Sequence, residues 1–329
     1  MPMTKYDHAV RLGQMALGYW TRMPRPLYMP IRMWIEPTNT CNLKCTMCPQ
    51  SSGEQFRRGF MEFDLFRKII DDAKHFVYDV NLHHSGESLL HPQIIDMIRY
   101  AKQAGLYTRL HTNATKLDEE KARGILDAGL DFLSFSFDGY DKDTYESIRK
   151  GAHFEHTLEN IVNFLLLKKS RGSERPFTVF EVINFSEKTD DTARQHAFKQ
   201  LFTGLPLDKF VLKSAHNWGG TYGADGKPLH PEKYCACTFP WYALVVFWNG
   251  NVSPCPQDFF NHLKLGNLQK STILDVWHGA PLAQLREKMK TRDYDDLNPC
   301  ATCDLLYRDS FLRIPTSHMK NFIRESLGK

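Results

Sequence analysis

The chain has 329 residues, of which 42% are hydrophobic and 24% are charged, so it is long enough and apolar enough to bury a substantial core. Its net charge of +4 is small and lacks the basic block or stripe typical of nucleic-acid-binding proteins. The sequence contains no apolar run of about 18 residues, the length that spans a membrane, and no signal peptide is evident. We therefore expect a cytoplasmic protein with neither a nucleic-acid partner nor a membrane span.

Strand and helix patterns alternate through the first two thirds of the chain. Short β-branched or aromatic runs bounded by turn residues predict strands at 32–37, 78–84, 107–111, 132–137, 177–183 and 209–214. Helical periodicity predicts helices at 64–76, 92–104, 118–128, 157–169 and 189–202. Such alternation favours parallel strands joined by right-handed crossovers. The predicted fold class is α/β, a partial (β/α)6 TIM-like barrel with functional residues at the carboxyl ends of its strands.

The composition changes near residue 219, where Gly, Pro, Cys and aromatic residues become frequent. Asn249-Gly250 predicts a tight turn between strands at 241–248 and 251–253, and helices are expected at 271–277 and 282–289. We expect an N-terminal extension at 1–30, the barrel at 31–218, and a small C-terminal β-hairpin and helix domain at 219–329.

Three of the eight cysteines stand directly after the first predicted strand. Cys41, Cys45 and Cys48 form a C-x3-C-x2-C pattern. Thiols stay reduced in the cytoplasm, so metal ligation or catalysis is expected rather than disulfides. Three thiolates on one loop can hold three irons of a cubane cluster and leave the fourth iron open. A zinc site lacking one ligand and a metal-free loop are the structural alternatives.

Four further cysteines are candidates for a second centre: Cys237, Cys255, Cys300 and Cys303. Four thiolates fully ligate a [4Fe-4S] cluster, but they equally suit zinc, and spacing alone does not separate the two metals. Cys235 remains as a spare buried thiol, an alternative ligand or a hydrogen-atom donor.

The N-terminal cysteine loop resembles the signature of the radical S-adenosylmethionine (SAM) superfamily. His84-Ser85-Gly86-Glu87 is similar to the family's Gly-Gly-Glu motif, with Ser85 where the first glycine is usual. The resemblance implies that SAM binds the open iron and is cleaved reductively to methionine and a 5′-deoxyadenosyl radical. The cofactor-binding residues that it implies are Gly86, Glu87, Asn113, Ser136 and Arg149.

The C-terminal region resembles the SPASM and twitch domains that follow many radical SAM barrels. The resemblance is carried by Cys237, Pro240-Trp241, Asn249-Gly250, Cys255, Gly266-Asn267 and Trp277. No cysteine follows Cys303, which matches the shorter twitch version with one auxiliary cluster. The resemblance therefore implies two [4Fe-4S] clusters, with metal ligands in both cysteine sets, and makes the last domain an iron-sulfur domain.

The leading functional expectation is a radical SAM oxidoreductase. This arrangement resembles the twitch-type sugar-alcohol dehydrogenases, which implies hydrogen abstraction from a small carbohydrate-like substrate and one electron accepted by the auxiliary cluster. An external one-electron reductant such as flavodoxin or ferredoxin is implied. Candidate catalytic residues are Cys235, His83 and His111, and His84, Glu181 and Lys213 are further candidates for the base by location.

Three alternatives remain at this point. A radical epimerase would use Cys235 as the hydrogen donor. A peptide-modifying SPASM enzyme is also compatible with the motifs, although the N-terminal extension is short for a separate peptide-recognition domain. A non-catalytic module would carry zinc at the C-terminal cysteines.

Overall fold

The computed structural model describes residues 5–185, 192–220 and 233–316. Its chain divides into two compact units. Unit 1 contains Arg32–Ala215 and Val246–Gly250, and unit 2 contains the described residues of Thr4–Ile31, His216–Val245 and Asn251–Lys329. Within these ranges, no helix has the length and apolarity needed to cross a membrane.

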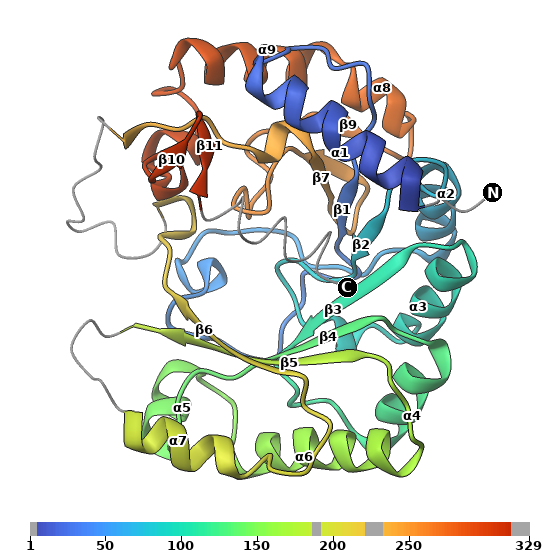
Figure 1. Ribbon diagram of the computed structural model, residues 1–329, viewed down its shortest axis with the longest axis vertical. Helices are drawn as coiled ribbons and strands as arrows, with labels where there is room; N and C mark the ends of the chain where they lie inside the picture. The colour runs from blue at the N-terminus through green and yellow to red at the C-terminus, as the bar shows by residue number, and fades with distance from the viewer. Residues whose placement is uncertain (1–4, 186–191, 221–232, 317–329) are drawn as a thin grey trace. The chain divides into compact units, whose positions relative to one another are not determined.

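Unit 1 is built on a parallel sheet whose strands follow the order β6-β5-β4-β3-β2-β1 (Figure 1). The strands are β1 (Arg32–Ile35), β2 (Asp79–Asn81), β3 (Tyr107–Thr112), β4 (Phe132–Ser136), β5 (Phe177–Asn184) and β6 (Lys209–Ser214). In this register Val80 pairs with Met33 on one side and Thr108 on the other. The predicted parallel α/β arrangement is confirmed, with β2 shorter than expected.

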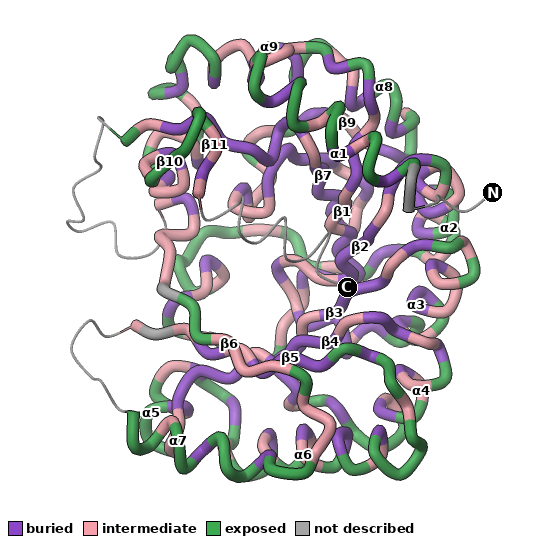
Figure 2. Tube along the Cα trace, in the orientation of Figure 1, coloured by how far each residue is buried: buried purple, intermediate pink, exposed green. Residues whose placement is uncertain are grey.

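Helices in unit 1 connect successive strands and bury one face each. They are α2 (Phe63–Ala73), α3 (Ile94–Gln103), α4 (Glu119–Ala128), α5 (Lys142–Ile148), α6 (Phe154–Ser170) and α7 (Thr192–Gln200). In α2, apolar residues three and four apart are buried, namely Phe66, Ile69, Ile70 and Ala73. Figure 2 shows the resulting pattern, with buried residues along the strands and exposed residues on the outer sides of the helices.

Helix boundaries follow the capping residues. Asp118 accepts a hydrogen bond from the Lys121 amide at the start of α4, and Gly129 ends that helix in the left-handed conformation. The sequence analysis did not predict α5, whose start is capped by Asp141. Residues 189–191 of the helix expected at 189–202 lie outside the described residues.

Unit 2 combines helices with short strands. Its elements are α1 (Lys5–Trp20), β7 (Ala243–Val246), β8 (Asn251–Ser253), β9 (Gly266–Asn267), α8 (Ile273–Trp277), α9 (Ala280–Thr291), β10 (Ser310–Phe311) and β11 (Ile314–Pro315). Among the strands, β8 and β9 form an antiparallel pair, as do β10 and β11. The first strand of the expected hairpin begins later than predicted, because Phe239–Trp241 form a 3-10 turn. The turn after β7, Val246–Gly250, is grouped with unit 1.

The N-terminal extension is packed into unit 2 by buried side chains. Arg286 of α9 is fully buried and donates hydrogen bonds to the carbonyls of Pro24 at 2.9 Å and Pro240 at 2.8 Å. The Trp277 indole N–H donates to the Tyr28 carbonyl at 2.5 Å. Because buried donors need partners, these bonds fix the segment that follows α1 against α8 and α9.

Candidate cofactor sites in the two units

The loop that carries Cys41, Cys45 and Cys48 follows β1 and is held by backbone hydrogen bonds. The amides of Lys44 and Thr46 donate to the carbonyls of Lys150 and Ile148, each at 2.9 Å. Leu43 and Met47, between the cysteines, are buried, whereas the three thiols are partly exposed. The loop is therefore anchored by its apolar residues, and its three cysteines are partly buried.

Burial favours the protonated form of these thiols while no metal is bound. It raises the pKa of Cys41 to about 11 and that of Cys48 to about 12, and it also raises the pKa of Cys45. Arg149 opposes this effect at all three thiols. Binding of a cationic iron centre by these cysteines would therefore release protons.

Glu87 is almost fully buried after β2 and joins this loop region to the end of β3. Its Oε2 accepts a hydrogen bond from the Asn113 amide at 2.7 Å, and its Oε1 accepts from the Thr112 hydroxyl at 2.8 Å and the Leu89 amide at 3.0 Å. Burial raises its pKa, and these hydrogen bonds oppose the rise. One lone pair on Oε2 stays available for an incoming ammonium group.

Gly86 lies directly against the backbone that precedes the cysteine loop. A Cβ atom at this position would lie 2.3 Å from the Thr38 carbonyl oxygen and 2.6 Å from that of Thr40. The Glu87 amide donates to the same Thr40 carbonyl at 2.9 Å. Only glycine fits this close approach.

Ser85 replaces the first glycine of the motif, and the structure gives it a partner. Its hydroxyl donates a short hydrogen bond to Glu36 Oε1, and its amide donates to the same oxygen at 3.3 Å. Glu36 is fully buried directly after β1 and also accepts from the Trp248 amide at 3.2 Å. The Gln50 side chain donates to the Ser85 carbonyl at 2.7 Å. Ser85 is thus fixed from both sides by residues that the sequence analysis did not single out.

Asn113, at the end of β3, contacts the cysteine loop directly. Its side-chain Nδ2 donates to Asn42 Oδ1 at 3.2 Å and lies 3.9 Å from Cys41 Sγ. Its side-chain Oδ1 accepts hydrogen bonds from the backbone amide and the hydroxyl of Thr115. The structure therefore brings Asn113, Glu87 and Cys41 together.

Arg149 follows α5 and is buried beside Asp138, with 2.7 Å between Nη2 and Oδ2. Burial disfavours its charge, but Asp138 and Cys45 outweigh this effect and raise its pKa above the usual value. Its Nε is buried and has no hydrogen-bond partner in the described residues. A buried guanidinium with an unused donor suits a carboxylate ligand. Ser136, partly exposed, ends β4 opposite Glu181 of β5.

His83 and His111 stack on each other at the carboxyl ends of β2 and β3, with ring centroids 4.2 Å apart. Burial, together with the nearby charges of Lys213 and Arg109, lowers the pKa of His111 to about 3. Burial and the neighbouring His111 lower the pKa of His83 well below its usual value. Lys213 itself pairs with Glu181 at 2.8 Å. Four of the proposed base candidates therefore form one polar group in unit 1.

The fifth base candidate, His84, faces a different environment. Its Nδ1 lies 3.3 Å from Glu36 Oε1, and its side chain is buried against Phe247 with ring centroids 5.2 Å apart. It therefore belongs to the hydrogen-bond group around Ser85.

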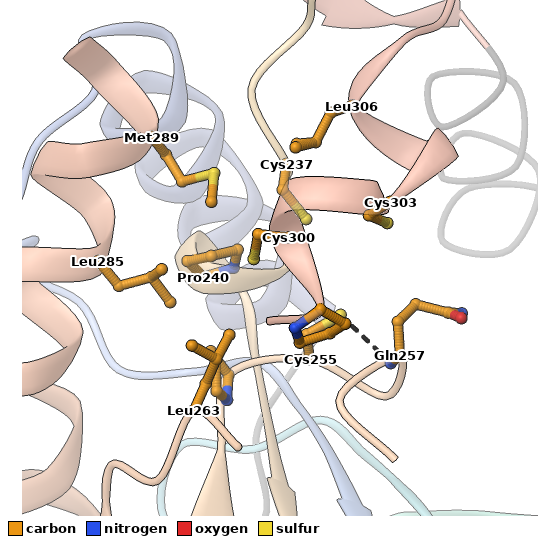
Figure 3. A pocket seen from close by; sticks show the side chains of 12 residues that line it. Cys237, Pro240, Cys255, Gln257, Leu263, Leu285, Met289, Cys300, Cys303 and Leu306 are labelled. Atoms are coloured by element: carbon orange, nitrogen blue, oxygen red, sulfur yellow. Dashed lines mark hydrogen bonds between the residues drawn. The ribbon is translucent and has the colours of Figure 1, made fainter. Parts of the chain in front are cut away.

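In unit 2, Cys237, Cys255, Cys300 and Cys303 line one cavity (Figure 3). The remaining wall is apolar apart from Gln257, and comprises Pro240, Pro254, Leu263, Leu285, Met289, Pro299 and Leu306. Residues from the segment before β7, the turn after β8 and the 3-10 turn Cys300–Thr302 thus bring the four thiols together.

The four thiols interact closely. A hydrogen bond between Cys237 and Cys255 lowers the pKa of Cys237, whereas burial raises the pKa values of Cys255, Cys300 and Cys303. The amide of Gln257 donates to Cys255 Sγ at 3.3 Å. An apolar wall with four sulfur donors fits a fully ligated iron-sulfur cluster.

Cys235 does not line this cavity. Its thiol is buried, donates to the Arg313 carbonyl at 3.3 Å and lies 3.5 Å from the Tyr19 hydroxyl. It lines a separate pocket with residues of α1 and α9. Cys235 and Cys237 are only two positions apart in the sequence, but their thiols lie in different pockets.

Glu36 and Asp138 are the residues that sequence reasoning missed. Both are acidic and fully buried, Glu36 directly after β1 and Asp138 two residues after the end of β4. An acidic residue inside or at the end of an apolar strand is the signal that could have identified them, because buried carboxylates need partners.

Comparison with known proteins identifies the two units. The profile of the radical SAM superfamily matches residues 35–197, and that of the SPASM iron-sulfur cluster-binding domain matches residues 235–304. The chain is 24% identical to the tungsten-containing aldehyde ferredoxin oxidoreductase cofactor-modifying protein of Pyrococcus furiosus, over 83% of this chain and 87% of that protein.

The chain is also similar to a dehydrogenase in sequence and to a solved structure in fold. The chain is 22% identical to the S-adenosyl-L-methionine-dependent 2-deoxy-scyllo-inosamine dehydrogenase of Niallia circulans, over 82% of this chain and 91% of that protein. The crystal structure of BtrN in complex with AdoMet and 2-DOIA superposes with a TM-score of 0.56 and 20% identity, covering 85% of this chain and 94% of that one. The latter shows the shared fold.

The chain is a radical SAM enzyme with a C-terminal SPASM-type domain. It uses SAM, a [4Fe-4S] cluster in its radical SAM domain and an iron-sulfur centre in its SPASM domain. The family match favours iron-sulfur over zinc at the second cysteine set. The residues of both sites fit these groups, as shown by the buried unused donor of Arg149 and the four convergent thiols of unit 2.

Proposed function

We propose that the enzyme oxidises a hydroxyl-bearing carbon of a small, carbohydrate-like substrate to a carbonyl. The observation that carries this proposal is the cavity in which Cys237, Cys255, Cys300 and Cys303 converge. Four thiolates leave no iron open to substrate, so the role that remains for the auxiliary cluster is to accept an electron. The similarity to the 2-deoxy-scyllo-inosamine dehydrogenase of Niallia circulans supports the same reaction class.

The cofactors together supply a 5′-deoxyadenosyl radical, which removes hydrogen from carbon, and an acceptor for one electron. The protein holds SAM in place: Cys41, Cys45 and Cys48 ligate three irons, Glu87 receives the ammonium group, and Arg149 with Ser136 receives the carboxylate. Asn113 adds a donor beside Cys41. These assignments are supported by the Asn113 contact to Cys41 and by the short Asn113 to Glu87 hydrogen bond.

Oxidation of an alcohol by this route also releases a proton. After loss of hydrogen from carbon, the substrate radical must give up one electron and its hydroxyl proton to become a carbonyl. We assign the proton acceptor to the His83 and His111 pair because of its position at the carboxyl ends of β2 and β3, where barrel enzymes place their functional residues; both rings are neutral at ordinary pH. The Nδ1 of His83 is buried without a hydrogen-bond partner in the described residues, so it offers a free acceptor position in one tautomer.

Glu181 and Lys213 lie near this pair and supply the polar contacts that hydroxyl groups need. Lys213 is half exposed and carries three donors, whereas Glu181 is mostly buried and accepts. A polyhydroxylated molecule can bond to both. The thiols that the cofactors require are also consistent with a reducing cytoplasm.

Deuterium transfer tests the proposal directly. Anaerobically reconstituted enzyme is incubated with SAM, dithionite and aminocyclitols or sugars deuterated at single hydroxyl-bearing carbons. We expect deuterium in 5′-deoxyadenosine and one carbonyl product per SAM consumed. Deuterium transfer without a carbonyl product would exclude dehydrogenation.

A second candidate is epimerisation with Cys235 as hydrogen donor. The observation in its favour is a buried, reduced thiol that the four-cysteine cavity does not use. Replacement of Cys235 by alanine distinguishes epimerisation from dehydrogenation. If the thiol returns hydrogen to the substrate, Cys235→Ala abolishes product and leaves SAM cleavage intact. Unchanged carbonyl formation by Cys235→Ala supports dehydrogenation.

A further inference from the structure

Unit 2 has a second pocket, of about 670 Å³, whose lining shares Met289 with the four-cysteine cavity. Met289 is buried, lines both cavities and is labelled beside the cysteine cavity in Figure 3. The second pocket is lined by Trp20, Thr21, Arg22, Tyr234, Cys235, Ala236, Met289, Lys290, Arg292, Ser310 and Arg313. Four of these residues are cationic and none is acidic.

Two of the cations are held in position by contacts within unit 2. The Arg22 guanidinium lies 3.9 Å from the Tyr19 ring centre and donates to the carbonyls of Tyr19 and Arg313. The Arg292 guanidinium lies 4.5 Å from the ring centre of Tyr234. Stacking and fixed hydrogen bonds lower the entropy that these side chains lose when they bind an anion.

Three of the cations have no carboxylate partner among the described residues: Arg22, Arg292 and Arg313 form none of the observed ion pairs. Lys290 pairs with Glu287 at 3.0 Å on the exposed surface of α9. The pocket therefore keeps a positive potential that favours an anionic partner.

The pocket also has the composition of a protein interface. Arg, Trp, Tyr and Met, the residue types enriched in such interfaces, supply six of its eleven lining residues. Exposed apolar side chains flank it: Leu17 and Trp20 on α1 are 57% and 54% exposed, and Phe311 and Leu312 are 60% and 69% exposed. A small ligand is usually enclosed by its pocket, whereas here the rim is formed by exposed side chains, which favours a protein partner.

We infer that this cationic pocket is the docking surface for an acidic one-electron carrier protein that exchanges electrons with the four-cysteine centre. The inference rests on the proposed function in one respect, namely that this centre carries an electron. The exchange moves one electron between the centre and the carrier, so that one is oxidised as the other is reduced, and no bond forms or breaks. Interfaces of such carriers are small and are guided by charge.

Binding affinity tests the surface itself. Oxidised bacterial flavodoxin, and separately an acidic ferredoxin, is titrated into the holoenzyme by calorimetry at low and high salt. We expect the double variant Lys290→Glu, Arg292→Glu to weaken binding at least about tenfold at low salt, because charge reversal turns attraction into repulsion. Arg25→Glu, Lys270→Glu makes the same change in net charge at exposed positions of unit 2 outside the pocket, and should leave affinity within about twofold.

Electron transfer provides a second measurement that does not depend on SAM chemistry. In full-length protein with Cys41, Cys45 and Cys48 replaced by alanine, the photoreduced auxiliary centre is mixed with oxidised flavodoxin, and the flavin semiquinone is followed. The pocket double variant should slow this reaction about tenfold and the control should not. Because the cysteine variant cannot cleave SAM, this result stands whether or not the substrate proposal survives.

Equal effects of the two double variants, or no effect of either with both carriers, would overturn the inference. A rise in melting temperature with inorganic phosphate alone, lost in the pocket variant and accompanied by no carrier binding, would also overturn it, since the site would then be one for a small anion.

Discussion

The Ser85 hydroxyl donates a hydrogen bond to the buried carboxylate of Glu36. This bond explains how serine replaces the first glycine of the motif: its side chain fills space beside β1 and satisfies a buried acid. Gly86 keeps its close approach to the carbonyls of Thr38 and Thr40, and the Glu87 amide still donates to the Thr40 carbonyl.

Removing the Glu36 carboxylate should destabilise unit 1. Glu36→Ala leaves the buried Ser85 donors and the partly buried Trp248 amide without this partner, and a buried donor left unpaired costs about 1–3 kcal/mol. We expect the free energy of unfolding to fall by about 3 kcal/mol in urea titrations, against about 1 kcal/mol for Ser85→Gly. The exposed residue Asp64 is the control, since Asp64→Asn should change little. Equal stability of Glu36→Ala and Asp64→Asn would contradict the assigned role.

Changing Arg149 should separate SAM binding from cluster assembly. Arg149→Lys keeps a charge beside Asp138 but loses the planar fork and the Nε donor. SAM affinity, measured by equilibrium dialysis under anaerobic conditions, should fall about tenfold or more while iron content is unchanged. Lys150→Met alters the exposed neighbour and should have no effect. Wild-type affinity in Arg149→Lys would remove Arg149 from the cofactor site.

The His83 and His111 pair should make the protein sensitive to acid. Their pKa values are lowered in the folded state, that of His111 to about 3, whereas the unfolded chain titrates near 6.5. The unfolded state therefore binds more protons below pH 6.5, so stability is full above this pH and is lost as the pH falls toward 3. The loss approaches about 1.4 kcal/mol per pH unit for each histidine.

His111→Phe keeps a ring against Phe132 and removes the titrating group. It should flatten the dependence of unfolding free energy on pH between about 6 and 4.5, as measured by urea titrations at several pH values. His75→Gln, at an exposed histidine of unit 1, should leave that dependence as it is. An unchanged slope in His111→Phe would show that His111 is protonated in the folded protein.

Replacing cysteines of unit 2 should separate Cys235 from the cluster ligands. Cys237→Ala removes a thiol of the four-cysteine cavity, so bound iron should fall from about eight to about four per chain. SAM cleavage should continue while carbonyl product is lost. Cys235→Ala, two residues away, should keep all of the iron, and a comparable loss of iron would make Cys235 a ligand.

Periodicity and turn residues predicted the parallel sheet of unit 1 well, because its β-branched and aromatic runs are bounded by turn residues and alternate with helical patterns. Helix α5 was missed because it is short and buries only Tyr145 among its residues. The expected hairpin strand at 241–248 was too long, since Phe239–Trp241 adopt a 3-10 turn fixed by tertiary contacts of Trp241 with Tyr19.

The C-x3-C-x2-C loop stands out in the sequence because its spacing is local, whereas the C-terminal cysteines, spread over 237–303, were assigned through the family resemblance. The Glu36 to Ser85 bond and the stacking of His83 on His111 were not predictable, since they join residues on different strands. The separation of Cys235 from Cys237 likewise depends on Tyr19 and Arg313, which are far away in the sequence.

Reductive cleavage of SAM tests the central claim most directly. Anaerobic, reconstituted and dithionite-reduced enzyme is incubated with SAM, and 5′-deoxyadenosine and methionine are quantified by mass spectrometry beside a Cys41→Ala variant. We predict equal amounts of both products from the wild type and none above background from the variant. Failure of the wild type to form 5′-deoxyadenosine, with both iron-sulfur centres loaded, would contradict the account.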